Sequence, residues 1–262
     1  MLLHLIDAFA DRPFAGNPAA VCFLDREQPA DEWLRAVAAE MNQAETAFLQ
    51  HAGNGYRLRW FTPVVEVDLC GHATLASAHF LWQAGLAPRG ATIPFETRSG
   101  LLSATPHGEE IELDFPAAAH QATNPPRGLA AALGVEVTDC WQAGADLLVL
   151  LPSEADVRRV APDFAALAKI PTRGIIITSL AADASCDFVS RFFAPAYGIP
   201  EDPVTGSAHC ALGPFWSARL GKTELVGRQL SRRGGVVCVR LAGNRAFLRG
   251  RAITTLRGEL IR

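Results

Sequence analysis

The chain contains one segment twice, about half a chain-length apart, and this repeat limits the folds that it can adopt. The first copy, RWFTPVVEVDLCGHATLASAH, spans residues 59–79, and the second, RFFAPAYGIPEDPVTGSAHCA, spans residues 191–211. The Arg-x-Phe-x-Pro pattern at 59–63 recurs 132 positions later, whereas the Cys-Gly pair at 70–71 recurs as Thr-Gly after 135 positions. Solenoid proteins repeat every ~20–50 residues, so a repeat of half the chain predicts two similar lobes.

Both copies have the same local pattern. A strand rich in aromatic and β-branched residues meets a proline, crosses a polar loop and leads into a helix of small residues, at 71–83 in the first copy and 206–220 in the second. The helix at 71–83 is almost entirely small or apolar, which predicts burial on most sides. Strands are expected at 3–8, 19–24, 47–50, 56–61, 91–97, 101–105, 111–115, 147–151, 174–178, 186–193, 236–241 and 246–248. Many strands with one long buried helix in each lobe predict the α+β class.

Composition narrows the classes of protein and partner. The chain has 262 residues, 49% hydrophobic and 19% charged, which is typical of a globular protein. A net charge of −3 gives no electrostatic reason to expect nucleic acid or a membrane surface as a partner. No apolar run approaches the ~18 residues of a membrane span. The six cysteines are scattered, without a CxxC pair, and the N-terminus has no basic leader, so we expect free thiols and a cytoplasmic location.

The boundary between the lobes is expected in a stretch rich in proline, alanine and asparagine. It lies between two segments with strand and helix patterns. We therefore predict a first lobe at 1–117, a linker at 118–128 and a second lobe at 129–251.

The starts of the two repeated helices are the first candidates for a site. A helix N-terminus presents unpaired N–H groups and about half a positive charge, which suit a carboxylate or phosphate. Pseudo-symmetry would place the two helix starts opposite each other across the cleft between the lobes. Such a cage for a small acid would be lined by Cys70, His72, Asp202, Thr205 and Ser207.

Two further positions have ordinary as well as functional interpretations. Glu45 lies between a helix pattern and a strand pattern, where a side chain can point along a sheet edge into a cleft, although a glutamate there is usually solvated. Gly16-Asn17-Pro18 is first of all a turn sequence, and a substrate contact by Asn17 is the alternative.

Five separated motifs together resemble the phenazine-biosynthesis PhzF-like isomerases. These are Gly16-Asn17-Pro18, Met41-Asn42 with Glu45-Thr46, the RWFTP segment, Asp68-Leu-Cys-Gly-His-Ala-Thr74, and Glu201-Asp-Pro-Val-Thr-Gly-Ser-Ala208. They occur in the family's order over essentially the whole chain. The resemblance implies a diaminopimelate epimerase-like fold, with two pseudo-symmetric lobes that each wrap a mixed sheet around a central helix. It also implies an interlobe site without a cofactor, a homodimer, and a C-terminal strand at about 252–262 that crosses back to the first lobe.

The resemblance also implies roles for individual residues. Glu45 matches the glutamate that moves the proton, and His72, Asp202 and Ser207 match groups that hold the substrate and assist the transfer. Gly71 and Gly206 would supply backbone N–H groups. Asn17 and Cys70 are further candidates for substrate contacts, and a small buried side chain that fills space is the alternative for Cys70. The function expected is a cofactor-independent isomerase that moves a proton on a small carboxylic acid, with Glu45 alternating as base and acid.

Alternatives remain beside this expectation. Epimerases and racemases of this fold use two facing cysteines, but here Cys70 is matched by Thr205, whose hydroxyl is far too weak a base. An epimerase or dehydratase that uses Cys70 alone stays open, as does a non-catalytic protein that binds small acids. No histidine or cysteine spacing predicts a metal site, and no GxGxxG follows a strand, so neither metal nor nucleotide cofactor is expected.

Overall fold

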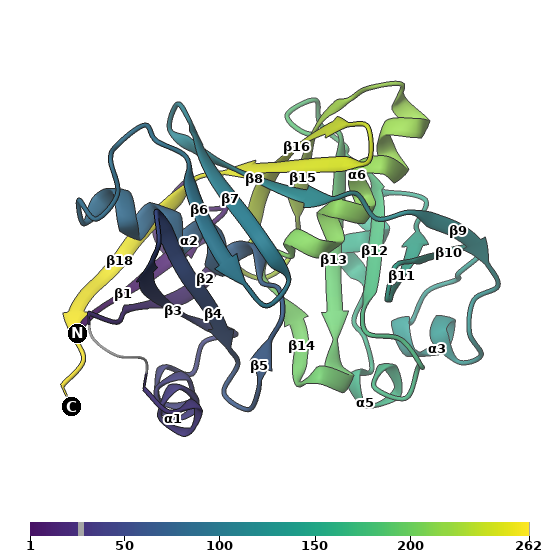
Figure 1. The fold of residues 1–262 in the computed structure, drawn as a ribbon. Helices are drawn as coiled ribbons and strands as arrows, with labels where there is room; N and C mark the ends of the chain where they lie inside the picture. Colours follow the sequence, from purple (N-terminus) through teal and green to yellow (C-terminus); the bar gives the residue numbers. More distant parts are fainter. Residues whose placement is uncertain (26–28, 262) are drawn as a thin grey trace. The chain divides into compact units, whose positions relative to one another are not determined.

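The computed structural model describes residues 1–25 and 29–261, and the chain forms two compact units. The first unit comprises Met1–Phe115 with Arg249–Arg262, and the second comprises Pro116–Leu248. Each unit combines strands with one long central helix (Figure 1). Most residues of that helix are buried. The predicted α+β class is confirmed.

The first unit is built around helix α2 (Gly71–Gln83), which contacts β1, β2, β3, β7 and β18. Its strands are β1 (Leu2–Ala8), β2 (Asn17–Phe23), β3 (Glu45–Ala52), β4 (Gly55–Phe61), β5 (Glu66–Val67), β6 (Ile93–Thr97), β7 (Gly100–His107), β8 (Glu110–Pro116) and β18 (Ala252–Glu259). Helix α1 (Asp31–Met41) packs Leu34, Val37 and Ala38 against Phe48 and Phe61 of the sheet. The helix lacking a polar face is therefore the one enclosed by strands, and the amphipathic helix lies outside.

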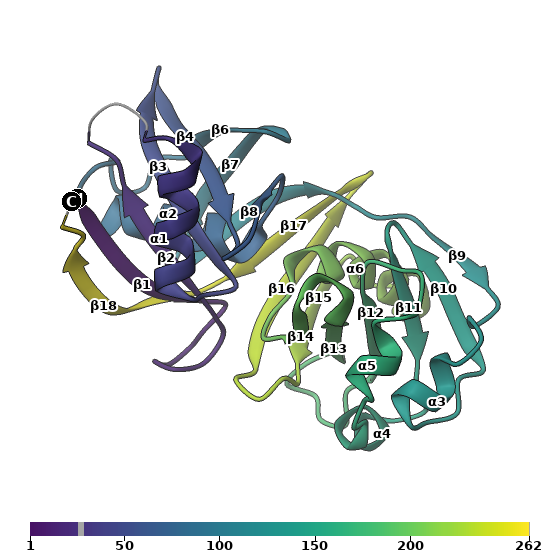
Figure 2. The same cartoon turned by 90° about the horizontal axis from the view of Figure 1, so that it is seen from below.

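The second unit has the corresponding central helix, α6 (Gly206–Leu220), which contacts β15 and β16. Its strands are β9 (His120–Thr123), β10 (Asp139–Ala143), β11 (Asp146–Leu150), β12 (Ile175–Leu180), β13 (Phe188–Ala194), β14 (Ile199–Asp202), β15 (Glu224–Gln229) and β16 (Gly235–Ala242), and β17 (Arg245–Gly250) contains the boundary with the first unit. The unit also has three short helices, α3 (Leu129–Leu133), α4 (Glu154–Arg159) and α5 (Phe164–Leu167) (Figure 2). They share one hydrophobic cluster with β11, β12 and β13. The 3₁₀ turn η1 (Pro195–Tyr197) follows β13.

The two sheets have the same order of strand pairings. In the first unit β18 pairs with β1 and β1 with β2, both antiparallel; β2–β3 is parallel, β3–β4 antiparallel, β4–β6 parallel and β6–β7 antiparallel. In the second unit the same alternation runs through β9, β10, β11, β12, β13, β15 and β16. The repeat seen in the sequence thus extends to the whole topology of each unit.

The structure corrects the predicted linker at 118–128. His120–Thr123 form strand β9, which pairs antiparallel with β10, and these residues belong to the second unit, which begins at Pro116. Composition misleads here because a short edge strand is held mainly by backbone hydrogen bonds and needs no apolar pattern of its own.

The C-terminal residues belong to the first unit. β18 lies antiparallel to β1, with Leu2 opposite Glu259 and Ala8 opposite Ala252. The second unit therefore ends at Leu248 and not at 251, and residue 262 of the predicted strand lies outside the described residues. None of the helices among residues 1–25 and 29–261 is long and apolar enough to cross a membrane.

Candidate active site

In the first unit, three of the predicted site residues lie together. His72 Nε2 is 3.5 Å from Glu45 Oε2, and His72 Nδ1 is 3.5 Å from Cys70 Sγ. The side chains of His72 and Glu45 are 6% and 13% exposed, and Cys70 is buried. The imidazole therefore lies between a thiol and a carboxyl group that retains limited access to solvent.

Strand order places Glu45 beside the helix start. Glu45 is the first residue of β3, which runs parallel to β2 with Ala19 opposite Glu45. Asn17, which is fully buried, is the first residue of β2. Because parallel neighbours begin at the same edge of a sheet, Asn17 and Glu45 lie along one edge. Asn42 ends α1 in the left-handed conformation, with φ of 50°, and turns the chain toward β3.

The loop before α2 is fixed by a largely buried arginine. Arg59 donates from Nε and Nη2 to the two oxygens of Glu66, both at 2.7 Å, and its guanidinium lies 4.9 Å from the Phe61 ring. The hydrogen bond from Arg59 holds the pKa of Glu66 below its ordinary value. Thr74 Oγ1 donates to the Cys70 carbonyl at 2.6 Å, so the first turn of α2 is held from within the helix.

Burial controls the charge of His72. Desolvation lowers its pKa to about 3, so the imidazole is neutral at physiological pH. A neutral imidazole carries one N–H. If Nε2 carries it and faces the Glu45 carboxylate, Nδ1 is left to accept from the Cys70 thiol. In the described part of the chain Nε2 makes no hydrogen bond, and its approach to Glu45 is a 3.5 Å contact.

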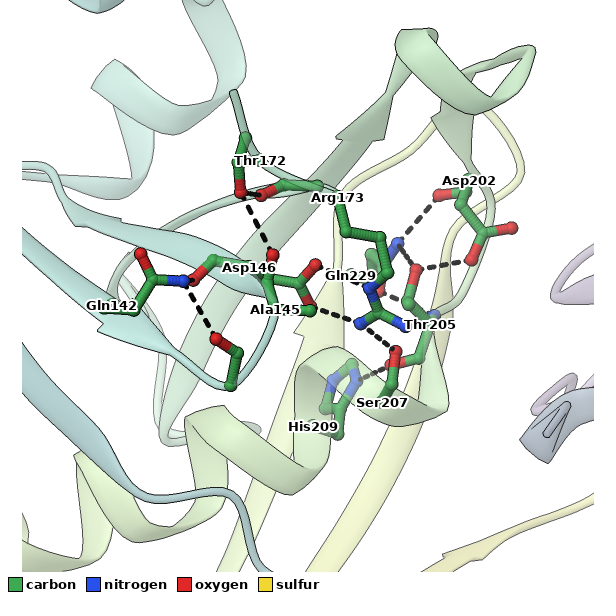
Figure 3. Close-up of polar contacts among 12 residues, drawn as sticks. Gln142, Ala145, Asp146, Thr172, Arg173, Asp202, Thr205, Ser207, His209 and Gln229 are labelled. Carbon is green, nitrogen blue, oxygen red and sulfur yellow. Dashed lines mark hydrogen bonds and ion pairs between the residues drawn. The ribbon is translucent and has the colours of Figure 1, made fainter. Parts of the chain in front are cut away.

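In the second unit, the start of α6 is held by Gln229, whose side chain is fully buried (Figure 3). Gln229 Oε1 accepts from the Thr205 backbone N–H at 2.9 Å, while Nε2 donates to the Asp202 carbonyl at 2.7 Å and to Thr205 Oγ1 at 3.2 Å. Thr205 Oγ1 then donates to Asp202 Oδ2 at 2.5 Å. The Thr205 hydroxyl is therefore committed as a donor to Asp202, which agrees with the sequence-based conclusion that it is no base.

Ser207 and Gly206 form the first turn of α6, and Ser207 has a charged neighbour. Arg173 Nη2 donates to Ser207 Oγ at 3.1 Å, and Arg173 also pairs with Asp146 through both Nε and Nη2 (Figure 3). Asp202 and Ser207 thus occur near the start of one helix, as the repeat predicts, while Glu45, Cys70 and His72 gather in the other unit.

The two helix starts are built in the same way. In the second unit Arg191 binds Glu201 through Nε and Nη2, at 2.7 and 3.0 Å, and lies 4.9 Å from the Phe193 ring. His209 Nδ1 donates to the Thr205 carbonyl at 2.8 Å, in the position of Thr74 in the first unit. Equivalent contacts thus hold the residue before each helix, which is Cys70 in one unit and Thr205 in the other.

The group at α2 is also the one that could hold a metal ion among the described residues. One ligand atom each from Glu45, Cys70 and His72 can be chosen so that all lie within 4.8 Å of one another. Thiolate, imidazole and carboxylate suit zinc. The sequence analysis assigned no metal here.

Sequence reasoning missed Gln229, Arg173 and Asp146. A signal existed for Gln229, because alternation along β15 places it on the inward face with Leu225 and Gly227. Asp146 directly precedes the apolar run of β11, and Arg173 directly precedes Gly174 and the apolar start of β12. A charged residue at the start of a buried strand indicates an ion pair at a sheet edge.

Comparison with known proteins identifies the family. The family model described as phenazine biosynthesis-like protein matches residues 6–258. The chain belongs to this family. An uncharacterized isomerase of Halalkalibacterium halodurans is 48% identical over 260 residues, which cover 99% of this chain and 98% of the relative. An uncharacterized isomerase of Pseudomonas aeruginosa is 49% identical over 257 residues, which cover 98% and 97%.

The fold of this phenazine biosynthesis-like protein also occurs among solved structures. The crystal structure of a PhzF-family protein of Enterococcus faecalis matches with a TM-score of 0.94 and 40% identity, covering 100% of this chain and 99% of the other. The resemblance expected from the five motifs is therefore confirmed, and the chain is an isomerase of the family.

Proposed function

We propose that this chain moves a proton on a small carboxylic acid without a cofactor, and that Glu45 accepts and returns the proton. The observation that carries the proposal is the contact of Glu45 with a neutral, buried His72 at 3.5 Å. A carboxylate with limited solvent access and an imidazole nitrogen 3.5 Å away has the elements of a general acid–base group.

His72 is proposed to orient the carboxylate. A neutral imidazole can donate one hydrogen bond to Glu45 without adding a positive charge that would suppress its basicity. Gly71, the first residue of α2, offers a backbone N–H at a helix start, which suits a carboxylate oxygen of the substrate. Asn17 is proposed as a further contact because it begins the strand beside β3.

The roles of Asp202, Gly206 and Ser207 rest on the family resemblance and on their position at the start of α6. Asp202 accepts from Thr205, and Ser207 accepts from Arg173, so each side chain has a fixed orientation. We assign Gly206 and Ser207 to substrate binding, and Asp202 to holding the substrate and assisting the proton transfer.

A reaction based on Cys70 is the second candidate, because Cys70 Sγ lies 3.5 Å from His72 Nδ1. To become a reactive thiolate, the Cys70 thiol would have to pass its proton to His72. Burial lowers the pKa of His72 to about 3, which opposes the formation of an imidazolium. At neutral pH a carboxyl group is ordinarily deprotonated and a thiol is not, so Glu45 is the more readily available proton acceptor of the two.

The test is a screen of small cyclic acids, unsaturated acids and amino acids with the enzyme in D₂O. The proposal expects deuterium to enter a carbon position of one acid while the molecular formula is otherwise retained, without added metal or cofactor. Loss of water or ammonia in place of simple isomerisation would favour the Cys70 alternative. Complete absence of exchange across the screen, with each acid shown to bind, would favour a non-catalytic binding protein.

The proposal includes a homodimer, as the resemblance implies. Sedimentation equilibrium should give about twice the chain mass of 28.1 kDa, and a mass of one chain at micromolar concentration would contradict it.

A further inference from the structure

The guanidinium group of Arg173 lies beside the first turn of α6 and is held by Asp146. Arg173 Nε donates to Asp146 Oδ1 at 2.8 Å, and Nη2 contacts both Asp146 Oδ2 and Ser207 Oγ (Figure 3). The Asp146 side chain is 3% exposed and that of Arg173 is 40% exposed. The arginine thus links a buried carboxylate to Ser207, with one side still open to solvent.

This contact fixes the direction of the Ser207 hydroxyl. Arginine has donors only, so Ser207 Oγ must accept from Arg173. The O–H of Ser207 then points away from the guanidinium and is able to donate to another acceptor. Ser207 is half-buried and is the second residue of α6, where backbone N–H groups also seek acceptors.

We propose that Arg173, held by Asp146, is a positioning residue that presents the Ser207 hydroxyl as a hydrogen-bond donor and so selects a deprotonated carboxylate over a neutral group. The inference rests on the proposed function in one respect: it takes Ser207 to contact the acid. It goes further by naming the residues that set the polarity of this contact, and Arg173 acts through Ser207 without touching the substrate.

The surrounding loops are built to hold this pair. The Arg173 backbone N–H and Thr172 Oγ1 both donate to the Ala145 carbonyl at 3.1 Å, which joins the starts of β11 and β12. A Cβ atom at Gly174 would lie 2.3 Å from the Phe192 ring and 3.0 Å from Asp146 Oδ1. Glycine at this position therefore leaves room for the Phe192 ring and for the carboxylate that holds Arg173.

The test measures binding of benzoate and of benzamide to the full-length chain by isothermal titration calorimetry. The two probes share a ring and differ in the charge of the acceptor. Arg173→Gln, Ser207→Ala and the double variant are compared with wild type. Arg173→Lys keeps the charge but cannot form the bidentate pair. Arg158→Gln removes an exposed arginine that pairs with Glu154 on α4 and serves as the matched control. Urea unfolding of each variant verifies that it is folded.

Wild type and Arg158→Gln should prefer benzoate to benzamide, and each of the two single variants at Arg173 and Ser207 should reduce the preference roughly tenfold, as for one hydrogen bond to a charged group. The double variant should lose no more than either single one, and Arg173→Lys should be intermediate. Independent, multiplicative losses in the double variant would show that Arg173 acts by charge alone and not through Ser207, which would overturn the inference. An unchanged preference for benzoate in Arg173→Gln, or no preference for benzoate in wild type, would overturn it as well. Because binding is measured without turnover, these results stand apart from the proton-transfer proposal, which the Glu45 variants test.

Discussion

Gln229 shows how much one buried polar side chain can determine at a helix start. It uses its carbonyl and both N–H groups to hold the Thr205 backbone, the Thr205 hydroxyl and the Asp202 carbonyl. The Gln229 amide nitrogen can only donate, so Thr205 Oγ1 accepts from it. The single O–H of Thr205 then donates to Asp202. Gln229 of β15 therefore sets the orientation of Asp202.

Replacement of Gln229 by methionine should therefore destabilise the protein. The volume is nearly kept, but the buried Thr205 N–H and the Asp202 carbonyl lose their partner, and each unsatisfied group costs ~1–3 kcal/mol. Urea unfolding should show a clearly lower midpoint. Gln121→Met, on the exposed edge strand β9, is the control and should change the unfolding free energy by less than ~0.5 kcal/mol. Equal midpoints for the two variants would contradict the importance of the network.

At the scale of the element, each central helix depends on the loop that precedes it. In the first unit Arg59 holds Glu66 and also contacts Asp31 Oδ1 at 2.9 Å, so it joins α1, β4 and β5. Ser99 Oγ donates to the Asp68 carbonyl at 2.6 Å and fixes the next part of the same loop. These contacts hold the loop that ends at Cys70.

Glu66→Gln should weaken this loop more than an ordinary surface change would. The Glu66 side chain is 11% exposed and accepts from Arg59 and Arg98, so loss of its charge leaves Arg59 with a poorer partner. We expect a loss of about 1–3 kcal/mol in unfolding free energy and slower deuterium exchange on the substrate found in the screen. Glu32→Gln, which breaks the exposed Arg35–Glu32 pair on α1, should have almost no effect on either. Equal effects of the two changes would argue against the clamp.

Helices and strands were predictable from the sequence where a run of apolar residues marks the element. The helix at 71–83 has the predicted bounds because its residues are almost entirely small or apolar, and the helix at 206–220 has its predicted bounds as well. Strand β9 and the pairing of β14 with β13 escaped prediction, since short strands are held by backbone bonds. Glu45 and His72 came from the family resemblance, whereas Arg173 and Asp146 required the ladder between β11 and β12 to be known.

At the scale of the whole molecule, buried histidines link stability to pH. Burial lowers the pKa of His72 to about 3 and the pKa values of His79 and His209 to about 4, from 6.5 in an exposed chain. The unfolded chain therefore binds protons below pH 6.5 that the folded chain does not. The full contribution of these histidines to the free energy of unfolding is present above pH 6.5. As the pH decreases toward 4, the free energy of unfolding falls by up to ~1.4 kcal/mol per pH unit for each histidine.

Urea unfolding at pH 7.5, 6.5, 5.5 and 5.0 measures this dependence. Carboxylates with lowered pKa, such as Glu66, lose their contribution only below about 4.5, so this range reports the histidines. His209→Gln should reduce the slope by about one proton, and Gln121→Met, which removes no titrating group, should leave it unchanged. A free energy of unfolding that is constant over this range would contradict the neutral state of the buried imidazoles.

The central claim is that Glu45 and not Cys70 carries the proton. Glu45→Gln keeps the size and hydrogen bonding of the side chain but removes its titration. On the acid found by the D₂O screen, deuterium exchange should fall by ~10²–10⁴-fold in this variant while binding persists. Cys70→Ala should retain most of the exchange, because it removes only a buried thiol beside His72. Wild-type exchange in Glu45→Gln together with an inactive Cys70→Ala would contradict the account and assign the chemistry to the thiol.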